Sequence, residues 1–435
     1  MLNLVSGDRY RDCEGHSRRN FLKVGMLGAG ALTLPMLLRE RANAAQGGRP
    51  VKNTSVVWLW LGGGPTHVET FDPKLTAPSE YRSVTGEEST PIPGVTVGGT
   101  LPKIASVADK MAFVRSFAHT NSGHGGGTHF VMTGYDNRQV DNGGVPSRPS
   151  IGAILSRTRG SSNSLTGIPT YIRMGNILGD GPAFLGTGYG PFDQNGKARK
   201  DMSLPVVEAR VEDRRGLLES LDTLNRDMDR SGVMHGLDQF EQQAFNLVFG
   251  SAAAAFDVRK EPSKVRDAYG RGGLGEQLLV ARKLCEAGCG FVTVQYGGWD
   301  MHGEIERAMK QRSPSLDQAV SAFVKDVYDR GLSDNILLVI SGEFGRTPRV
   351  NKNAGRDHWA PLSTLALAGG GLRMGQVVGE SASKLDVPKT TPIRPQDLMA
   401  TVFHVLGIDQ KQQFSSPGGR PVYMIENGKP ISELV

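Results

Sequence analysis

The sequence predicts an α/β fold with a doubly wound, mainly parallel sheet and helices on both of its faces. Four apolar runs are continuous rather than alternating, which is typical of strands that are covered on both faces. Each run ends in glycines, and segments of helical periodicity lie between and after them. The runs are SVVWLWL at 55–61, FVTVQY at 291–296, NILLVI at 335–340 and STLALA at 363–368.

The predicted helices occupy 274–287, 315–330 and 396–406, where apolar residues recur at helical spacing. The last two each begin after a proline, which is common in the first turn of a helix. The stretch from about 176 to 262 is polar and rich in charge instead. It predicts two or three amphipathic helices that are inserted into the domain as a lid or side subdomain.

The first 44 residues have the pattern of an export signal. SRRNFLK at 17–23 sets twin arginines before an apolar segment at 24–38, and Ala42 and Ala44 form a small-residue cleavage pattern. A membrane anchor is the alternative, but an uncharged run of about fifteen residues is short for a hydrocarbon core of ~30 Å. We therefore expect a twin-arginine signal peptide at 1–44 and one α/β domain at 45–435.

This expectation fixes the predicted location and partners. The twin-arginine export machinery would deliver the folded protein to the periplasm or the extracellular space, with no stable membrane span after cleavage. The whole chain has 50 Lys and Arg residues against 44 Asp and Glu, and without residues 1–44 the balance is 43 against 40. A nearly neutral mature chain gives no indication of nucleic-acid binding. The spacing of Cys285 and Cys289 leaves open whether they form a disulfide or remain buried thiols.

Side chains of the metal-ligand type follow three of the predicted strands. Because the carboxyl ends of parallel strands lie at one edge of a sheet, the loops that follow them converge there. A further segment, SFAHTNSGHGGGTHFVMTGY at 116–135, adds three histidines among glycines and hydroxyls. The residues are His67, Glu69 and Asp72 after 55–61, Asp300 and His302 after 291–296, Glu343, Asp357 and His358 after 335–340, and His119, His124 and His129 in 116–135.

Carboxylates and neutral imidazoles are ligands of Zn²⁺, Mn²⁺ and Fe, and oxygen-rich sets bind Mg²⁺ or Ca²⁺. Any one such residue after a strand is most often a helix cap or a turn residue, and Asp357 could serve only to orient His358. The joint placement of these residues nevertheless indicates a site for one or two divalent metal ions. Other chemistry has less support, since LGGGPT lacks the Lys-Ser/Thr of a phosphate-binding loop and no G-x-S-x-G nucleophile elbow occurs.

In chain order, the segments WLWLGGGPTHVETFDPK, GTHFVMTGY, GGWDMHGE, SGEFGRTP, GRDHWAP and RPQDLMATVFHVLGID span most of 56–409. Together they resemble the alkaline phosphatase and sulfatase superfamily, and within it a group of twin-arginine-exported proteins labelled as a domain of unknown function. The resemblance implies an alkaline-phosphatase-like fold with one or two divalent metals at the strand ends. It also implies hydrolysis of phosphate or sulfate esters.

The resemblance also suggests roles for individual residues. Metal binding falls to Asp300, His302, Glu343 and His358, together with His67 or Asp72 after the first strand. Substrate binding is predicted for His129 and Arg346, and the catalytic position for Ser122 or His124.

The sequence departs from the superfamily pattern at two places. Phe344 follows Glu343 where the superfamily has a histidine, and His124 stands where a nucleophilic Ser, Thr or modified Cys is expected. Ser122 is two residues from that position and Thr128 four. The nucleophile is therefore displaced, or water attacks directly, or the site binds without reacting.

Three hypotheses for function follow. The first is an exported metal-dependent hydrolase of phosphate or sulfate esters, with an anionic ester as substrate and a preference for carbohydrate or another large anion because of the insert. The second is a catalytically inactive, metal-containing binding or assembly module on the same fold, which the missing nucleophile favours. The third treats the polar loops as structural and expects no metal.

Overall fold

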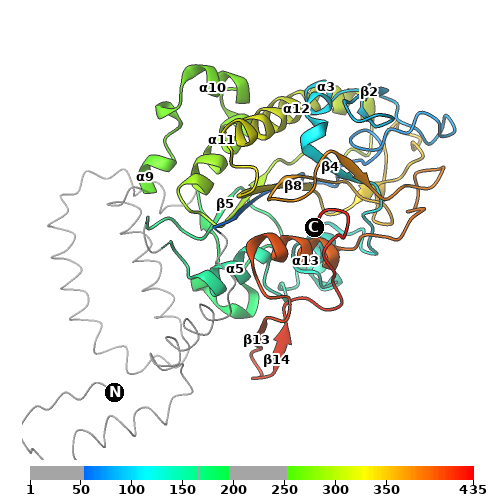
Figure 1. The fold of residues 1–435 in the computed structure, drawn as a ribbon. Coiled ribbons are helices and arrows are strands. Elements are labelled where there is room, and N and C mark those ends of the chain that lie inside the picture. The colour runs from blue at the N-terminus through cyan, green and yellow to red at the C-terminus, as the bar shows by residue number, and fades with distance from the viewer. Residues whose placement is uncertain (1–52, 164–165, 195–251) are drawn as a thin grey trace, which may run out of the picture. The chain divides into compact units, whose positions relative to one another are not determined.

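An eight-stranded sheet lies at the centre of the structure, a computed structural model that describes residues 53–163, 166–194 and 252–435. The strand order is β12-β4-β11-β8-β1-β7-β5-β6 (Figure 1). The strands are β1 (Ser55–Trp60), β4 (Met111–Val114), β5 (Tyr171–Met174), β6 (Phe192–Asp193), β7 (Phe291–Gln295), β8 (Ile336–Ser341), β11 (Leu365–Gly369) and β12 (Gln376–Val378).

Most neighbouring strands run parallel, and β11 is the reversed member of the sheet. β1 pairs in parallel with β7 and β8, and β5 pairs in parallel with β7 and β6. β11 is antiparallel to both of its neighbours, β8 and β4, while β12 is parallel to β4. The predicted runs at 55–61, 291–296, 335–340 and 363–368 correspond to β1, β7, β8 and β11, and the predicted fold class is confirmed.

Helices cover both faces of the sheet, because successive side chains of a strand point to opposite sides. Figure 1 shows α11 and α12 on one side of the sheet and α5 and α13 on the other. In β1, Leu59 belongs to the buried cluster under α11 and α12, whereas Trp58 belongs to the cluster with α5 and α13, and both side chains are fully buried. The helices are α3 (Pro102–Ser106), α4 (His124–Thr133), α5 (Ile151–Arg159), α9 (Ala252–Ala255), α10 (Ser263–Tyr269), α11 (Gly273–Glu286), α12 (Ile305–Asp329) and α13 (Pro395–Leu406).

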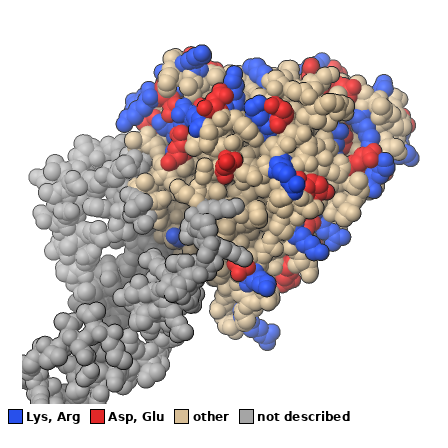
Figure 2. Space-filling view, viewed as in Figure 1, with Lys and Arg blue, Asp and Glu red and all other residues tan. Residues whose placement is uncertain are grey.

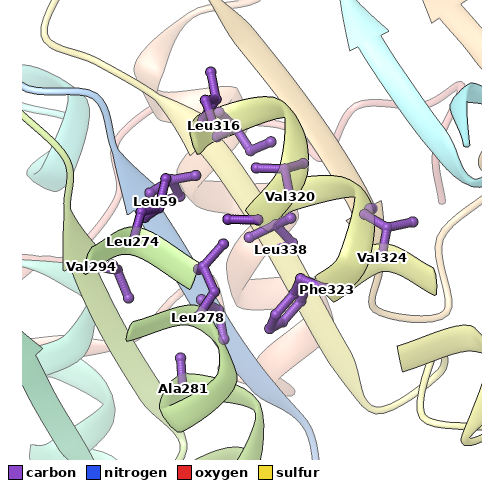
Figure 3. Packing of buried hydrophobic residues seen from close by; sticks show 14 of the residues in the cluster. Leu59, Leu274, Leu278, Ala281, Val294, Leu316, Val320, Phe323, Val324 and Leu338 are labelled. Carbon is purple, nitrogen blue, oxygen red and sulfur yellow. The ribbon is translucent and has the colours of Figure 1, made fainter. Parts of the chain in front are cut away.

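The face under α11 and α12 is apolar, as Figure 3 shows from close by. Leu278 of α11 and Phe323 of α12 belong to one buried cluster with Leu59 of β1 and Leu338 of β8. Full burial of a Leu or Phe side chain contributes roughly 1.5–3 kcal/mol. This cluster therefore fixes the three central strands whose carboxyl ends carry the polar loops.

The helix predicted at 315–330 begins earlier than expected, because α12 starts at Ile305 and contains Pro314 in its interior. The proline lacks an N–H and gives up one backbone hydrogen bond. The buried positions continue across it, from Ile305 and Met309 to Leu316 and Val320. Packing of this face on the core therefore outweighs the local helix-breaking effect of the proline.

Short elements form the connections. Three two-stranded sheets pair β2 (Glu87–Ser89) with β3 (Thr96–Gly98), β9 (Gly345–Arg346) with β10 (His358–Trp359), and β13 (Gln413–Ser415) with β14 (Pro421–Tyr423). The 3₁₀ helices are η1 (Ala108–Lys110), η2 (Arg138–Asn142), η3 (Ala183–Leu185), η4 (Thr187–Tyr189) and η5 (Val258–Lys260).

Two predicted segments fall outside the described residues. The predicted signal peptide at 1–44 lies wholly outside them, and so does 195–251, the central part of the insert predicted at 176–262. The described ends of that insert contain η3, η4, β6, α9 and η5, and β6 extends the sheet by pairing with β5. The helices predicted within 195–251 therefore stay a prediction.

Charges of both signs share the surface of the molecule. On the face shown in Figure 2, lysines and arginines are intermixed with aspartates and glutamates. This mixture matches the nearly equal numbers of basic and acidic residues in the chain. None of the helices in the described part of the chain combines the length and the apolarity that crossing a membrane requires.

Candidate metal centre

Two glycines after β1 bring the loops that follow β1, β7 and β8 together. Gly63 has a φ of +113°, and a Cβ there would lie 2.5 Å from the backbone nitrogen of Asp300. Gly64 has a φ of +78°, and a Cβ there would overlap the ring of Phe344. Glycine adopts positive φ without steric strain. The glycines therefore let Asp300 and Phe344 approach the end of the first strand.

Four side chains from these loops and from α4 meet at the carboxyl edge of the sheet, and we call them the histidine–aspartate cluster. They are Asp300, His302, His358 and His124. Asp300 Oδ1 lies 3.0 Å from His302 Nε2 and 3.1 Å from His358 Nε2, and these two nitrogens are 3.1 Å apart. Asp300 Oδ2 lies 3.5 Å from His124 Nε2. All three histidines thus direct Nε2 toward one carboxylate.

Each of these histidines has its Nδ1 within hydrogen-bond distance of an acceptor oxygen. The pairs are His302 Nδ1 with Asp357 Oδ1 at 2.8 Å, His124 Nδ1 with Glu343 Oε1 at 2.8 Å, and His358 Nδ1 with the Ser122 carbonyl at 2.9 Å. Carbonyl and ionised carboxylate oxygens only accept hydrogen bonds, so each Nδ1 carries a proton. In His302 and His358, a neutral ring in this tautomer presents a bare Nε2, as metal-binding histidines do.

The inner nitrogens therefore fit a metal ion. His302 Nε2 and His358 Nε2 face each other at 3.1 Å, a distance at which two imidazole nitrogens share either a proton or a cation. Metal–nitrogen bonds of about 2.0–2.1 Å in a tetrahedron place two ligand atoms roughly 3.3 Å apart. Ligand atoms of His124, Asp300 and His358 also lie within 4.8 Å of one another. The donor set suits Zn²⁺, Mn²⁺ or Fe²⁺.

Arg346, predicted to bind substrate, is fully buried beside the cluster and is engaged by the protein itself. Its Nε donates to the Gly64 carbonyl at 2.8 Å, its Nη1 donates to the Arg356 carbonyl at 3.1 Å, and its Nη2 contacts Asp300 Oδ1. Burial raises the pKa of Asp300, but the hydrogen bond and the positive charge of Arg346 are the main effects that outweigh it and bring the pKa to about 2. Arg346 thus keeps Asp300 ionised and in place.

Glu343, predicted to bind metal, is turned toward His124. Its Oε1 accepts hydrogen bonds from the Gly63 N–H at 2.8 Å and from His124 Nδ1 at 2.8 Å. The hydrogen bond with Glu343 raises the pKa of His124 above its usual range. The other oxygen, Oε2, is buried and has no hydrogen-bond partner among the described residues. Glu343 therefore orients His124 at the rim of the cluster.

Phe344 occupies the position where the resemblance leads us to expect a histidine. Its ring centroid lies 4.3 Å from that of His358 and 5.2 Å from that of His124. The side chain is fully buried. Phe344 therefore adds no ligand and supplies an apolar wall that packs against two of the imidazoles.

The glycine-rich segment at 124–127 is the first turn of α4, and His124 is its first residue. The Gly126 N–H donates to Asp141 Oδ1 at 2.9 Å. A Cβ at Gly126 would lie 2.5 Å from Asp141 Oδ2, and one at Gly127 would lie 2.9 Å from the Glu343 carbonyl oxygen. The absence of side chains here lets α4 pack directly on these groups, and this contact places His124 in the cluster.

Two other residues predicted near the catalytic centre have backbone partners. Ser122 Oγ accepts a hydrogen bond from the Ala360 N–H at 3.1 Å. His129 is fully buried in α4; its Nδ1 lies 2.8 Å from the Tyr135 carbonyl, and its Nε2 accepts from the Ser147 N–H at 3.2 Å. Both ring nitrogens of His129 are thus engaged, and the structure does not bring the residue into the cluster.

His67 and Asp72, the predicted ligands after the first strand, lie apart from the cluster and line a small cavity with Arg115. His67 Nε2 lies 2.9 Å from the Leu385 carbonyl, and burial lowers the pKa of the ring to about 4. Asp72 Oδ1 lies 3.4 Å from Arg115 Nε, and burial raises the pKa of this carboxyl. These contacts hold both side chains in the buried interior of the loop.

Sequence reasoning missed two supports of the site. Asp141 caps α4 from η2, and Arg356 forms a fully buried ion pair with Glu69 at 2.7 Å. Arg356 directly precedes Asp357 and His358 in the chain, so this pair anchors the loop that carries them. The two partners are 287 positions apart in sequence, and no local pattern connects them.

The sequence and the fold were compared with known proteins. A family model described as Protein of unknown function (DUF1501) matches residues 53–435, and no curated protein matches the sequence. Three similar solved structures are the lipoteichoic acid synthase LtaP from Listeria monocytogenes (10% identity, 88% of this chain and 76% of that chain, TM-score 0.40), the PsFucS1 sulfatase from Pseudoalteromonas sp. (13%, 86% and 70%, 0.37), and a mutant of TAB5 alkaline phosphatase with bound Mg (10%, 83% and 100%, 0.36).

Proposed function

This chain belongs to the family described as Protein of unknown function (DUF1501), and we propose that it is an exported, metal-dependent hydrolase of phosphate or sulfate esters. One observation carries the proposal: three imidazoles with fixed Nδ1 atoms direct Nε2 toward a single carboxylate, that of Asp300. Such a donor set suits a divalent cation, and the carboxyl edge of a sheet is where loops can surround a substrate.

Asp300, His302 and His358 are the proposed metal ligands, because their donor atoms lie 3.0–3.1 Å from one another. A bound divalent ion would neutralise charge on the ester oxygens and lower the pKa of a water molecule. Asp357 holds His302 in the tautomer that this role requires, and the Ser122 carbonyl does the same for His358.

His124 is the proposed proton donor for the leaving group. Its side chain is 42% exposed, so a substrate can reach it, and its Nε2 points to the cluster. The hydrogen bond with Glu343 raises its pKa and so favours the protonated ring. A protonated imidazole beside the scissile bond can donate to the departing oxygen, which typically accelerates a reaction about 10²–10⁴-fold. Glu343 positions the ring for this step.

Water, and not Ser122, is the proposed nucleophile. A nucleophilic hydroxyl requires a base within hydrogen-bond reach. The described contact of Ser122 Oγ is instead with the Ala360 N–H. A water molecule that has released one proton to solvent would attack the phosphorus or sulfur as hydroxide, while His124 protonates the leaving oxygen and then takes up a proton from solvent.

Export and substrate size are further parts of the proposal. The twin arginines in SRRNFLK and the alanines at 42 and 44 support export by the twin-arginine route to the periplasm or the extracellular space. The polar insert at 176–262 supports a carbohydrate ester or another large anionic ester as substrate. Mass spectrometry of the exported protein tests the first point, because the mature chain is expected to start close to residue 45.

A second candidate function is a metal-containing binding or assembly module without catalysis. The observation that favours it is the position of Ser122, whose hydroxyl is held by a backbone N–H, together with the histidine at position 124 where the superfamily has its nucleophile. Under this alternative the metal and an anionic ligand stabilise the protein, and no ester is cleaved.

The test combines metal analysis with an ester assay. The exported protein, the variant His302→Gln/His358→Gln and a control with His404→Gln on the exposed side of α13 are analysed by elemental mass spectrometry. We expect about one transition-metal equivalent in the parent and the control, and none in the double variant. Phosphate and sulfate esters of one alcohol are then assayed before and after chelation. Metal without turnover of any ester would favour the binding module, and a folded parent that takes up no metal would contradict both candidates.

A further inference from the structure

We infer that the cluster prefers esters that carry one negative charge, namely sulfate monoesters and phosphate diesters, over phosphate monoesters that carry two. This inference rests on the proposed function, because it concerns the substrate of the same site. It follows from the charges that the described residues place around the cluster and from the contacts that already engage them.

The described residues surround the cluster with more negative than positive charge. The carboxylates of Asp300, Asp357 and Glu343 contact its histidines, and Arg346 is the Lys or Arg side chain that contacts a member of the cluster in the described ranges. A divalent ion adds two positive charges, so the loaded centre, His124 apart, is formally neutral. At such a centre a monoanion leaves one uncompensated negative charge and a dianion leaves two, so the electrostatic penalty is larger for the dianion.

Arg346 cannot bind the substrate directly and so cannot compensate the second negative charge of a phosphate monoester. Its side chain has no exposed surface. Its guanidinium donates to the carbonyls of Gly63, Gly64 and Arg356 and to Asp300. The two-pronged contact by which an arginine usually recognises phosphate needs two free N–H groups on one side. Those groups already hold the loops of the site.

An exposed arginine of η2, which packs on α4, is engaged as well. Arg138 lies 3.5 Å from Asp136 Oδ2 and donates to the Thr120 carbonyl at 3.3 Å. The rim next to His124 is apolar at Leu178, which is 56% exposed and whose Cδ2 lies 3.1 Å from where a Cβ on Gly125 would be. An apolar rim suits a substituted ester oxygen better than a second anionic one.

The inference is tested by anion binding, which does not depend on turnover. Isothermal titration calorimetry at about pH 7.5 compares dimethyl phosphate with methyl phosphate, whose second pKa is ~6, on the metal-loaded protein and after chelation. We expect dimethyl phosphate to bind the loaded protein at least about tenfold more tightly, which corresponds to ~1.4 kcal/mol. Equal or tighter binding of methyl phosphate to the loaded protein would overturn the inference.

A charge variant provides a matched test. Leu178→Lys adds a cation to the rim, and Leu178→Gln is the uncharged control. We expect Leu178→Lys to tighten binding of methyl phosphate about fivefold relative to Leu178→Gln, with less than half that effect on dimethyl phosphate, because a Coulomb interaction near the surface contributes ~1 kcal/mol. The same gain for both anions, or none for either, would count against the inference.

Turnover separates this inference from the proposed function. Sulfate, phosphate diester and phosphate monoester substrates with a 4-nitrophenol leaving group are compared, and the phosphate monoester is also measured near pH 5, where a much larger share of it carries one charge than at pH 7.5. Its kcat/KM relative to that of the diester is expected to rise at least about threefold on acidification. A loaded protein that shows the anion preference and cleaves none of the esters would contradict the hydrolase and leave the charge preference standing.

Discussion

The histidine–aspartate cluster and the pair formed by His67 and Asp72 both lie in loops that follow strands of the same sheet, and they differ in what surrounds each side chain. In the cluster, outer nitrogens are hydrogen-bonded and inner nitrogens face a shared carboxylate. In the pair, His67 Nε2 lies within hydrogen-bond distance of the Leu385 carbonyl, and Asp72 lies beside Arg115.

The comparison shows that a strand-end position does not by itself make a ligand. Residues of both sets have the same chemistry, and both sets follow apolar strands in the sequence. The cluster directs its donor atoms to one point, where Arg346 contacts Asp300 Oδ1 and lies 3.4 Å from His302 Nε2, and the side chains of Asp300 and His302 are exposed. The pair is almost fully buried. Donor atoms directed to a common centre, rather than residue type, therefore distinguish the candidate metal site from the core of the loop.

The largest expected effect separates the two sets directly. His358→Gln removes a proposed ligand, so we expect metal affinity to fall at least about 10³-fold and ester hydrolysis to fall with it. His67→Gln should leave the metal content unchanged, since its Nε2 is engaged by a carbonyl outside the cluster. Elemental mass spectrometry of the two variants, with circular dichroism to verify folding, checks this contrast. Loss of metal from a folded His67→Gln protein would contradict the distinction between the cluster and the His67–Asp72 pair.

A smaller effect is expected inside the cluster at His124, which contacts Asp300 less closely than the other two histidines do. His124→Gln should lower kcat about 10²–10⁴-fold and retain the metal, because the ring is proposed to transfer a proton. Steady-state kinetics and metal analysis on the same sample measure both quantities. If the metal disappears together with the activity, His124 belongs to the ligands instead.

The hydrogen bonds to the outer nitrogens should have a smaller effect, on metal affinity. Asp357→Asn keeps the size of the side chain but weakens its hold on His302 Nδ1. We expect metal affinity to decrease about 10–100-fold, as is typical for partners that orient metal-binding histidines. Competition with a chelating dye measures the affinity, and Asp329→Asn, at an exposed carboxylate of α12, serves as the control. An unchanged affinity would show that Asp357 does not position a ligand.

The pair is expected to affect stability rather than metal binding. Burial lowers the pKa of His67 to about 4, so the unfolded chain takes up the proton first as the pH falls. The free energy of unfolding is thus highest above the usual histidine pKa and declines between about pH 6.5 and 4. From pH 7 to 5 the contribution of His67 to this decline is about 2 kcal/mol.

His119 also lowers the free energy of unfolding as the pH falls, because burial lowers its pKa to about 4 as well. Urea denaturation at pH 7 and pH 5 therefore compares the parent with His67→Gln. In this variant the contribution of His119 to the decline remains. A parent and a variant with equal pH dependence would show that His67 is not buried in its neutral form.

Much of the fold was accessible from sequence because its central strands are continuous apolar runs. β1, β7, β8 and β11 were found within one or two residues of their observed bounds. β4, β5, β6 and β12 were not identified, because short strands at or near the edges carry weaker patterns. The start of α12 was wrong since the proline marked a helix start locally, while the buried face continues through it.

The site was predictable in composition and less so in arrangement. Asp300, His302 and His358 come together as expected for loops at the carboxyl edge. Glu343 turns to His124, and Asp357 orients His302 rather than His358. These choices depend on contacts between distant segments, which no local sequence pattern reports.

The reversed direction of β11 affects how the site is connected. Because β11 lies antiparallel to its neighbour β8, the chain leaves β8 and enters β11 at the same edge. The segment 342–364 therefore begins and ends on adjacent strands, and it contains Glu343, Arg346, Asp357 and His358. Each doubling of the length of a loop between two fixed ends raises the entropic cost of folding by only about 0.6 kcal/mol. Several residues of the site thus lie on one connection between adjacent strands, whose length can vary most readily at the exposed turn at 352–354, because Phe344, Arg346 and Arg356 are fully buried.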